Sequence, residues 1–186
     1  MGKLQDSLER ASAAAATRPV PKSAQARMRF LLKQAKGSTR VVADRLGVSQ
    51  RTVERYLKGT LRRPRKDLAA RLEREVRRDW QPRVKARARR HAATSGGITV
   101  ETRAQLGYTG APGSSDQDRT RLLTQHLPPA YAARLFDAQA AGAGETDLQA
   151  IVAEGLRDLY FRDRGRRARS LEEVRINHID YIEIGF

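Results

Sequence analysis

Cysteine is absent from this chain of 186 residues, and its absence excludes several kinds of site. Without thiols there can be no disulfide framework, no thiolate nucleophile and no cysteine-rich zinc site, and the composition fits a reducing interior. Histidine is scarce as well. His91, His126 and His178 stand at no metal-ligand spacing, so we expect no metal site and no cofactor of the chain's own.

Long apolar runs are also missing. No stretch approaches the roughly 18 apolar residues that span a bilayer, and the opening segment MGKLQDSLER carries acids where a secretory signal would be apolar. We therefore expect a soluble, cytoplasmic protein with no membrane partner.

Net charge is the strongest signal that is present, and it is confined to one half of the chain. Residues 1–95 carry 26 Lys or Arg against 8 Asp or Glu, whereas residues 96–186 carry 11 against 13. A field of that size attracts polyanions, and cations that neutralise phosphates release counterions. An anionic membrane is disfavoured because no segment pairs a basic face with a broad Trp, Phe or Leu face. The charge distribution predicts that the first half binds nucleic acid.

Composition and periodicity predict a mostly α chain with some β, in three parts. Residues 1–22 read as a flexible N-terminal arm that begins with a short helix, residues 23–95 as a basic helical domain and residues 96–186 as an α+β domain, with the clearest linker at ATSGG. In the basic domain we predict helices over 24–34, 39–46, 50–58 and from Pro64 to Trp80. The run RVKARARRHAA that follows is either a basic helix lying on DNA or an arm that orders on binding.

For the second half of the chain we predict three extended segments, two helices and one long loop. Alternating apolar residues predict strands over 98–108 and near the C-terminus, and residues 119–127 are extended. Two helices are predicted, over 129–141 and from Thr146 onward. Between the first two extended segments lies the Gly- and Ser-rich loop 107–118.

The segment VVADRLGVSQRTVERYLKG fits a helix-turn-helix position by position. Its inward positions are apolar or small: Val42, Ala43, Leu46, Val48, Val53 and Leu57. Gly47 supplies the turn, and Ser49 caps a recognition helix that runs to Lys58 and also offers a phosphate contact. The outward residues at the start of that helix should reach base edges in the major groove: Gln50, Arg51, Thr52 and Arg55.

Further cations are expected to hold phosphates rather than read bases, because no framework fixes their orientation. They are Arg62, Arg63, Arg65, Lys66, Arg83, Lys85 and Arg87, with the other members of the run 83–90. These side chains should set the affinity for DNA and its salt dependence.

No catalytic site is evident in the second half. Asp116 and Asp118 lie two apart in a loop, Asp158 and Asp163 are expected in surface ion pairs, and there is no nucleophile–base triad or P-loop. The second half also matches the outline of a ribbon-helix-helix, in which strands pair between subunits. The match consists of the extended segment RTRLLTQHLPP, a helix, a glycine turn and a second helix. The near-neutral charge of this half favours a homodimer or partner docking over a second DNA contact.

Three stretches, LPPAYAARLFDAQAAGA, EGLRDLYFRD and INHIDYIEIGF, give the chain a family likeness. With the overall length and the order of a basic half before a neutral half, they resemble the telomere terminal proteins of linear Streptomyces chromosomes and plasmids. The resemblance implies a protein that binds replicon ends, primes 5′-end DNA synthesis through a side-chain hydroxyl and stays covalently attached to the DNA. Such a protein is located at chromosome ends in the nucleoid.

The resemblance also implies partners. They are telomeric DNA with its single-stranded overhang, a telomere-associated protein, and a DNA polymerase that brings the divalent metal and the deoxynucleotide. The chain itself is then an acceptor and not an enzyme.

A primer hydroxyl must sit on a segment that can enter a polymerase site, where metal ions activate its oxygen. The loop GAPGSSDQD qualifies, so Ser114 and Ser115 are the first candidates. The resemblance implies a threonine in this region, which keeps Thr109 and Thr120 as candidates. The residues alone also allow a helix-turn-helix transcriptional regulator or nucleoid protein with a C-terminal dimerisation domain.

Overall fold

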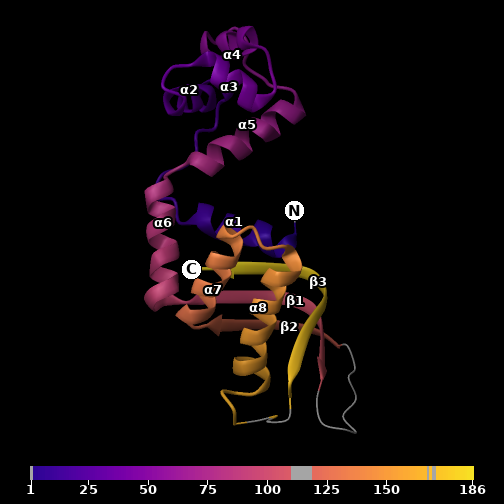
Figure 1. Ribbon diagram of the computed structural model, residues 1–186. Helices are drawn as coiled ribbons and strands as arrows, with labels where there is room; N and C mark the ends of the chain where they lie inside the picture. Colours follow the sequence, from indigo (N-terminus) through magenta and orange to yellow (C-terminus); the bar gives the residue numbers. More distant parts are fainter. Residues whose placement is uncertain (1, 110–118, 167, 169–170) are drawn as a thin grey trace. The chain divides into compact units, whose positions relative to one another are not determined.

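A computed structural model describes residues 2–109, 119–166, 168 and 171–186 (Figure 1). The fold is mixed α and β, with one three-stranded antiparallel sheet. The chain divides into two compact units. We call Ala16–Pro82 the helical unit, and the stretch up to Ala15 together with Arg83–Phe186 the sheet unit.

The helical unit consists of four helices around one core. They are α2 (Ala24–Gln34), α3 (Thr39–Leu46), α4 (Gln50–Leu57) and α5 (Lys66–Asp79). Side chains at the N-caps of the first three, Ser23, Ser38 and Ser49, each accept a hydrogen bond from a backbone N–H of the first turn. The predicted helices over 24–34 and 39–46 are thereby confirmed, and the predicted helix 50–58 ends one residue earlier.

Gly47 makes the turn between α3 and α4 possible. Its φ is +63°, a left-handed conformation that disfavours a side chain. A Cβ at this position would also lie 2.9 Å from an Nη of Arg71 on α5. The guanidinium of Arg71 could shift to make room, so it is the left-handed backbone of the turn that favours glycine.

The sheet unit is built on the strand order β2-β1-β3, with β1 (Ile98–Thr109), β2 (Arg119–Leu127) and β3 (Glu173–Gly185). Figure 1 shows α7 (Pro129–Ala140) and α8 (Glu145–Leu156) lying across the sheet. A π-helical turn, η2 (Arg157–Phe161), continues α8. The strand and helix predictions for this half are confirmed, except that the last strand begins at Glu173.

Two irregularities in β3 explain an apparent break in its apolar pattern. Ile176, Ile179 and Ile182 do not share one parity, yet they pair with Leu106, Ala104 and Thr102 on the same face of β1. The register shifts beside Arg103 and Gln105 each insert one extra β3 residue, which restores the alternation. These three isoleucines therefore lie on one face of the sheet.

The N-terminus differs in part from its prediction. The expected short helix is present as α1 (Lys3–Ala14), but it is packed and not part of a flexible arm, because Leu4 and Leu8 are fully buried in the core of the sheet unit. The Ser7 hydroxyl accepts a hydrogen bond of 2.8 Å from the Ile184 N–H, and Lys3 donates to the carbonyl of Ile179. The helix thus covers the outer edge of β3, because side chains of α1 satisfy polar groups that no strand pairs.

The predicted boundary at residue 95 is also wrong. The chain passes from the helical to the sheet unit at Pro82, so α6 (Pro82–His91) and the π-helical turn η1 (Ala92–Gly96) belong to the sheet unit. The stretch ATSGG is therefore no linker: Ala92 just before it is buried, and Gly97, at φ +69°, lies where a Cβ would meet the Leu127 carbonyl oxygen at 2.3 Å. None of the helices in the described ranges has the length and apolarity needed to cross a membrane.

Candidate nucleic-acid interface

The exposed end of α4 is the first element of the candidate interface. Val53 and Tyr56 turn into the core, which leaves Gln50, Arg51 and Arg55 exposed. The cap holds this end in place, because the Ser49 hydroxyl accepts the Thr52 N–H at 3.2 Å and lies 2.9 Å from the Thr52 hydroxyl. A helix of eight residues thereby presents a polar, basic first turn to solvent.

The N-terminus of α3 lies beside that of α4. The Gln50 amide donates a hydrogen bond of 2.8 Å to the hydroxyl of Thr39, the first residue of α3. Both helix ends carry unsatisfied N–H groups and partial positive charge, so their adjacency favours an anion. One amide hydrogen and the carbonyl oxygen of Gln50 remain for a further partner.

Acidic side chains of the helical unit gather on α5, where arginines neutralise them. Arg45 on α3 forms ion pairs with Glu75 at 2.5 Å and Asp79 at 2.6 Å, and Arg27 on α2 pairs with Glu73 at 3.4 Å. Hydrogen bonding to Asp79 raises the pKa of Arg45, so this cation is committed to the α3–α5 contact.

The cations of α4 and of the segment after it have no such partners. The unit contains 19 Lys or Arg against 6 Asp or Glu. In the part of the chain that the structure describes, no ion pair involves the following side chains: Arg51, Arg55, Lys58, Arg62, Arg63, Arg65 and Lys66. Part of the surplus positive charge of the unit is therefore carried on α4 and the residues that follow it, while other exposed cations, among them Arg29, Arg40 and Arg74, lie elsewhere in the unit.

Three residues of this surface were missed by sequence reasoning. Tyr56 takes the buried place that was predicted for Leu57, which is only half-buried. Thr39 is the partner of Gln50, and Arg40 is an exposed cation in the first turn of α3. Only Arg40 had a usable signal, as a cation at the start of the first helix of the motif.

The predicted phosphate contacts on α6 lie on the other unit. Arg83 and Arg87 are exposed, one helical turn apart, and Lys85 is half-buried. Arg89 is different: it donates to the Ser12 hydroxyl at 3.0 Å and the Gln139 carbonyl oxygen at 2.9 Å, and burial lowers its pKa. The predicted DNA-contacting residues are therefore divided between the two units.

Two of the four candidate primer hydroxyls, Ser114 and Ser115, lie outside the described residues. Thr109 is the last residue of β1, and Thr120 is an exposed residue of β2 that pairs with Gln105. Thr109 and Thr120 thus lie at neighbouring ends of two strands that pair with each other.

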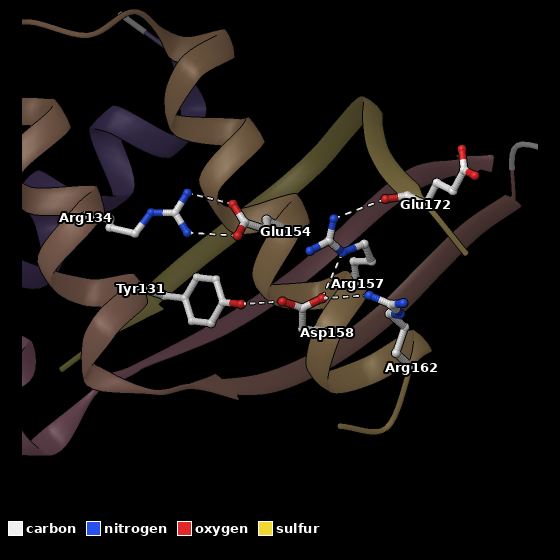
Figure 2. A network of polar contacts seen from close by, with 7 residues as sticks. All are labelled: Tyr131, Arg134, Glu154, Arg157, Asp158, Arg162 and Glu172. Carbon is white, nitrogen blue, oxygen red and sulfur yellow. Dashed lines mark hydrogen bonds and ion pairs between the residues drawn. The ribbon is translucent and has the colours of Figure 1, made fainter. Parts of the chain in front are cut away.

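A polar network joins α7 to α8 and η2 (Figure 2). The Tyr131 hydroxyl donates to Asp158 at 2.7 Å, and Arg134 makes a two-pronged contact with Glu154 at 3.0 and 2.6 Å. Burial and the bond to Asp158 raise the pKa of Tyr131 to about 12, so the phenol stays protonated at neutral pH. The prediction that Asp158 forms ion pairs is confirmed by its contact with Arg157 at 2.8 Å. The network is a structural tie between helices.

Within the described ranges, no cluster of His, Asp or Glu side chains has an arrangement suited to a metal ion. Comparisons of this chain with protein-family models, with curated proteins and with solved structures found no match.

Proposed function

We propose that the helical unit binds double-stranded DNA through a helix-turn-helix formed by α3 and α4, with α4 in the major groove. The observation that carries the proposal is the exposed, capped first turn of α4, whose cations have no acidic partners among the described residues. Gln50 can pair with the edge of adenine, and Arg51 or Arg55 with that of guanine. Arg62, Arg63, Arg65 and Lys66 then hold phosphates beside the groove.

The test removes charge from two places in the same unit. Arg51→Gln/Arg55→Gln should weaken duplex binding by at least about ten-fold, since the removal of each base contact costs about 1–3 kcal/mol. The matched control is Arg29→Gln/Arg74→Gln, which removes two exposed cations from α2 and α5. Titration by fluorescence anisotropy at fixed salt measures both. Equal losses of affinity in the two variants would show that total charge matters and that α4 does not.

We further propose that the chain is a terminal protein that holds a DNA end and supplies the first primer hydroxyl. In this reaction the side-chain oxygen attacks the α-phosphorus of a deoxynucleoside triphosphate, pyrophosphate leaves, and the new 3′-hydroxyl is extended. A polymerase supplies the metal ions and the catalysis, and a telomere-associated protein supplies recruitment. The support is the family resemblance; of the candidate hydroxyls, the two that the structure describes, Thr109 and Thr120, lie at neighbouring ends of the paired strands β1 and β2.

Trypsin separates the candidate hydroxyls for a direct test. Cleavage after Arg103 and Arg119 yields peptide 104–119, which contains Thr109, Ser114 and Ser115, whereas Thr120 falls in the dipeptide 120–121. DNA ends isolated without protease, then digested with nuclease and trypsin, should yield peptide 104–119 with the added mass of a deoxynucleotide. A nucleotide on a peptide of the helical unit would overturn the assignment, and DNA ends free of protein would overturn the priming role.

The second candidate is a DNA-binding regulator or nucleoid protein that dimerises through its sheet unit. One observation favours it: β2 is an edge strand, and in the described residues no strand pairs with its outer side, whereas α1 covers the edge of β3. Leu122 on β2 is 71% exposed. A homodimer in sedimentation, with DNA binding fully reversible by salt, would favour this function.

A further inference from the structure

The fold segregates the charges of the second half, although their total is close to neutral. From residue 96 onward all eleven basic residues are arginine. Nine of them fall in segments 119–121 and 157–175, which contain only four of the thirteen acids. Arginine, unlike lysine, offers a planar fork for phosphate and a flat surface for stacking.

The sheet brings the described residues of these two segments to one end of the sheet unit. Arg121 pairs with Ala104 of β1, and Arg119 with Leu106. On the other side of β1, Arg175 of β3 pairs with Gly107. Figure 1 shows that the end of β1, the starts of β2 and β3 and the end of α8 lie together there.

Aromatic rings lie among the arginines. The Arg121 guanidinium lies over the Phe161 ring at 5.2 Å from its centroid. The rings of Tyr108 and Tyr160 lie 6.4 Å and 5.0 Å from the same ring. Tyr160 is 42% exposed, so part of its ring is open to solvent. We call this group, with Arg162, Arg164 and Arg166, the arginine–aromatic end.

Among the described residues of these two segments seven arginines stand against four acids, Asp158, Asp163, Glu172 and Glu173, so the acids neutralise only part of the charge. Asp158 is shared by Arg157 at 2.8 Å and Arg162 at 3.8 Å, and Glu173 pairs with Arg175 at 3.5 Å. Arg164 and Arg166 are exposed, and no ion pair of either appears among the described contacts. A net positive surface with an exposed ring is left over.

We propose that the arginine–aromatic end binds single-stranded DNA. Unpaired bases present faces that can stack on Tyr160, and the surrounding arginines can hold the phosphates of the same strand. A duplex hides its base faces, so it could use only the charges. This surface lies on the sheet unit, needs no residue of α4, and would hold a strand beside the end of β1 whether or not the chain acts as a primer.

The experiment uses the full chain carrying Arg51→Gln/Arg55→Gln, which silences the proposed duplex contact. Binding is measured by fluorescence anisotropy with an oligo-dT of about twenty nucleotides, which is longer than a typical single-strand site. The parent protein should bind this probe. Tyr160→Ala should weaken binding by at least about five-fold, which corresponds to the loss of roughly 1 kcal/mol of stacking. Tyr160→Phe, which keeps the ring, should restore the affinity. Arg164→Gln/Arg166→Gln should weaken binding and reduce the salt slope by about 0.7 for each phosphate that the protein no longer neutralises.

The matched control is Arg10→Gln/Arg103→Gln, which removes two exposed arginines of the sheet unit that lie outside these segments. Its affinity for oligo-dT should stay within about two-fold of the parent value, the range expected for surface charges away from the site. Equal losses of affinity in the control and the Arg164/Arg166 variant, or no effect of Tyr160→Ala, would overturn the proposal. Tighter binding of oligo-rU or of a duplex by the same protein would overturn the assignment to single-stranded DNA. The duplex contact is measured separately with intact α4, so either proposal can fail alone.

Discussion

At the scale of single residues, the bond between Tyr131 and Asp158 ties α7 to η2. Hydrogen bonding to Arg157 and then to Tyr131 lowers the pKa of Asp158 from its ordinary 3.8. A carboxyl whose pKa is lower in the folded than in the unfolded chain stabilises the fold at any pH above its unfolded-state pKa. This stabilisation is lost as the pH falls through the folded-state pKa. The pKa of Tyr131 is raised from 10.0 to about 12. The stabilisation from this shift is therefore present below the unfolded-state pKa of the phenol and is lost as the pH rises through the folded-state pKa.

Tyr131→Phe should therefore lower the free energy of unfolding by about 1 kcal/mol at pH 7, because a partly exposed bond to a carboxylate is removed. The difference from the parent protein should shrink below pH 3.8, as Asp158 becomes protonated. Urea unfolding at neutral and at acidic pH, followed by circular dichroism, measures both. Tyr160→Phe is the control, and a destabilisation of the same size there would contradict the assignment.

At the scale of elements, Ser49 has two separable roles in α4, as a helix cap and as part of the surface proposed to face DNA. Ser49→Ala should lower stability by about 1 kcal/mol. Ser49→Asp should keep the cap and the stability, but weaken duplex binding, because it places a negative charge where a phosphate approaches.

The control for this pair is Ser23→Ala on α2, which removes a cap of the same kind from another helix and leaves the first turn of α4 unchanged. It should lower stability to a similar degree and leave the duplex affinity of the folded protein unchanged. Thermal unfolding and anisotropy on the same samples separate the two effects. If Ser49→Asp bound duplex as tightly as the parent chain, α4 would not be in the groove.

The helix α1 is the second element with a testable role. Leu8 is fully buried, so Leu8→Ala should lower the free energy of unfolding by about 3 kcal/mol through reduced burial and an incompletely closed cavity. Its exposed neighbour offers the control, since Glu9→Ala should change stability by less than about 0.5 kcal/mol. Similar urea midpoints for the two variants would mean that α1 is a flexible arm that does not contribute to the core.

At the scale of the whole molecule, the helical unit is an insertion between α1 and the rest of the sheet unit. Fragment 16–82 has its own core and should fold alone, with a helical circular dichroism spectrum and duplex binding. Fragment 83–186 lacks α1, so Leu4 and Leu8 are missing from its core and the edge of β3 is bare. It should aggregate or remain unfolded.

A permuted chain distinguishes this explanation from a general weakness of the fragment. Joining residues 2–15 to the C-terminus of 83–186 by a flexible linker should restore cooperative unfolding. A well-folded 83–186 without α1 would show that the edge of β3 does not need its cover.

Local chemistry by itself determined much of this protein. Apolar spacing, the caps Ser38 and Ser49 and the turn at Gly47 were enough to predict α2, α3 and all of α4, with one residue too many at its end, because these signals act within a few residues along the chain. The same spacing singled out Gln50, Arg51, Thr52 and Arg55 as outward, and all but the half-buried Thr52 are exposed. That they contact DNA remains a prediction.

Only the tertiary structure decided which distant segments meet. Nothing local shows that α1 covers β3, that two bulges bring Ile176 and Ile179 to one face, or that ATSGG lies inside a unit. Nor does a near-neutral composition reveal that arginines from two distant segments and an exposed tyrosine gather at one end of a sheet. These features depend on strand pairing and on core packing between residues far apart in the chain, whereas caps and periodicity depend on neighbours.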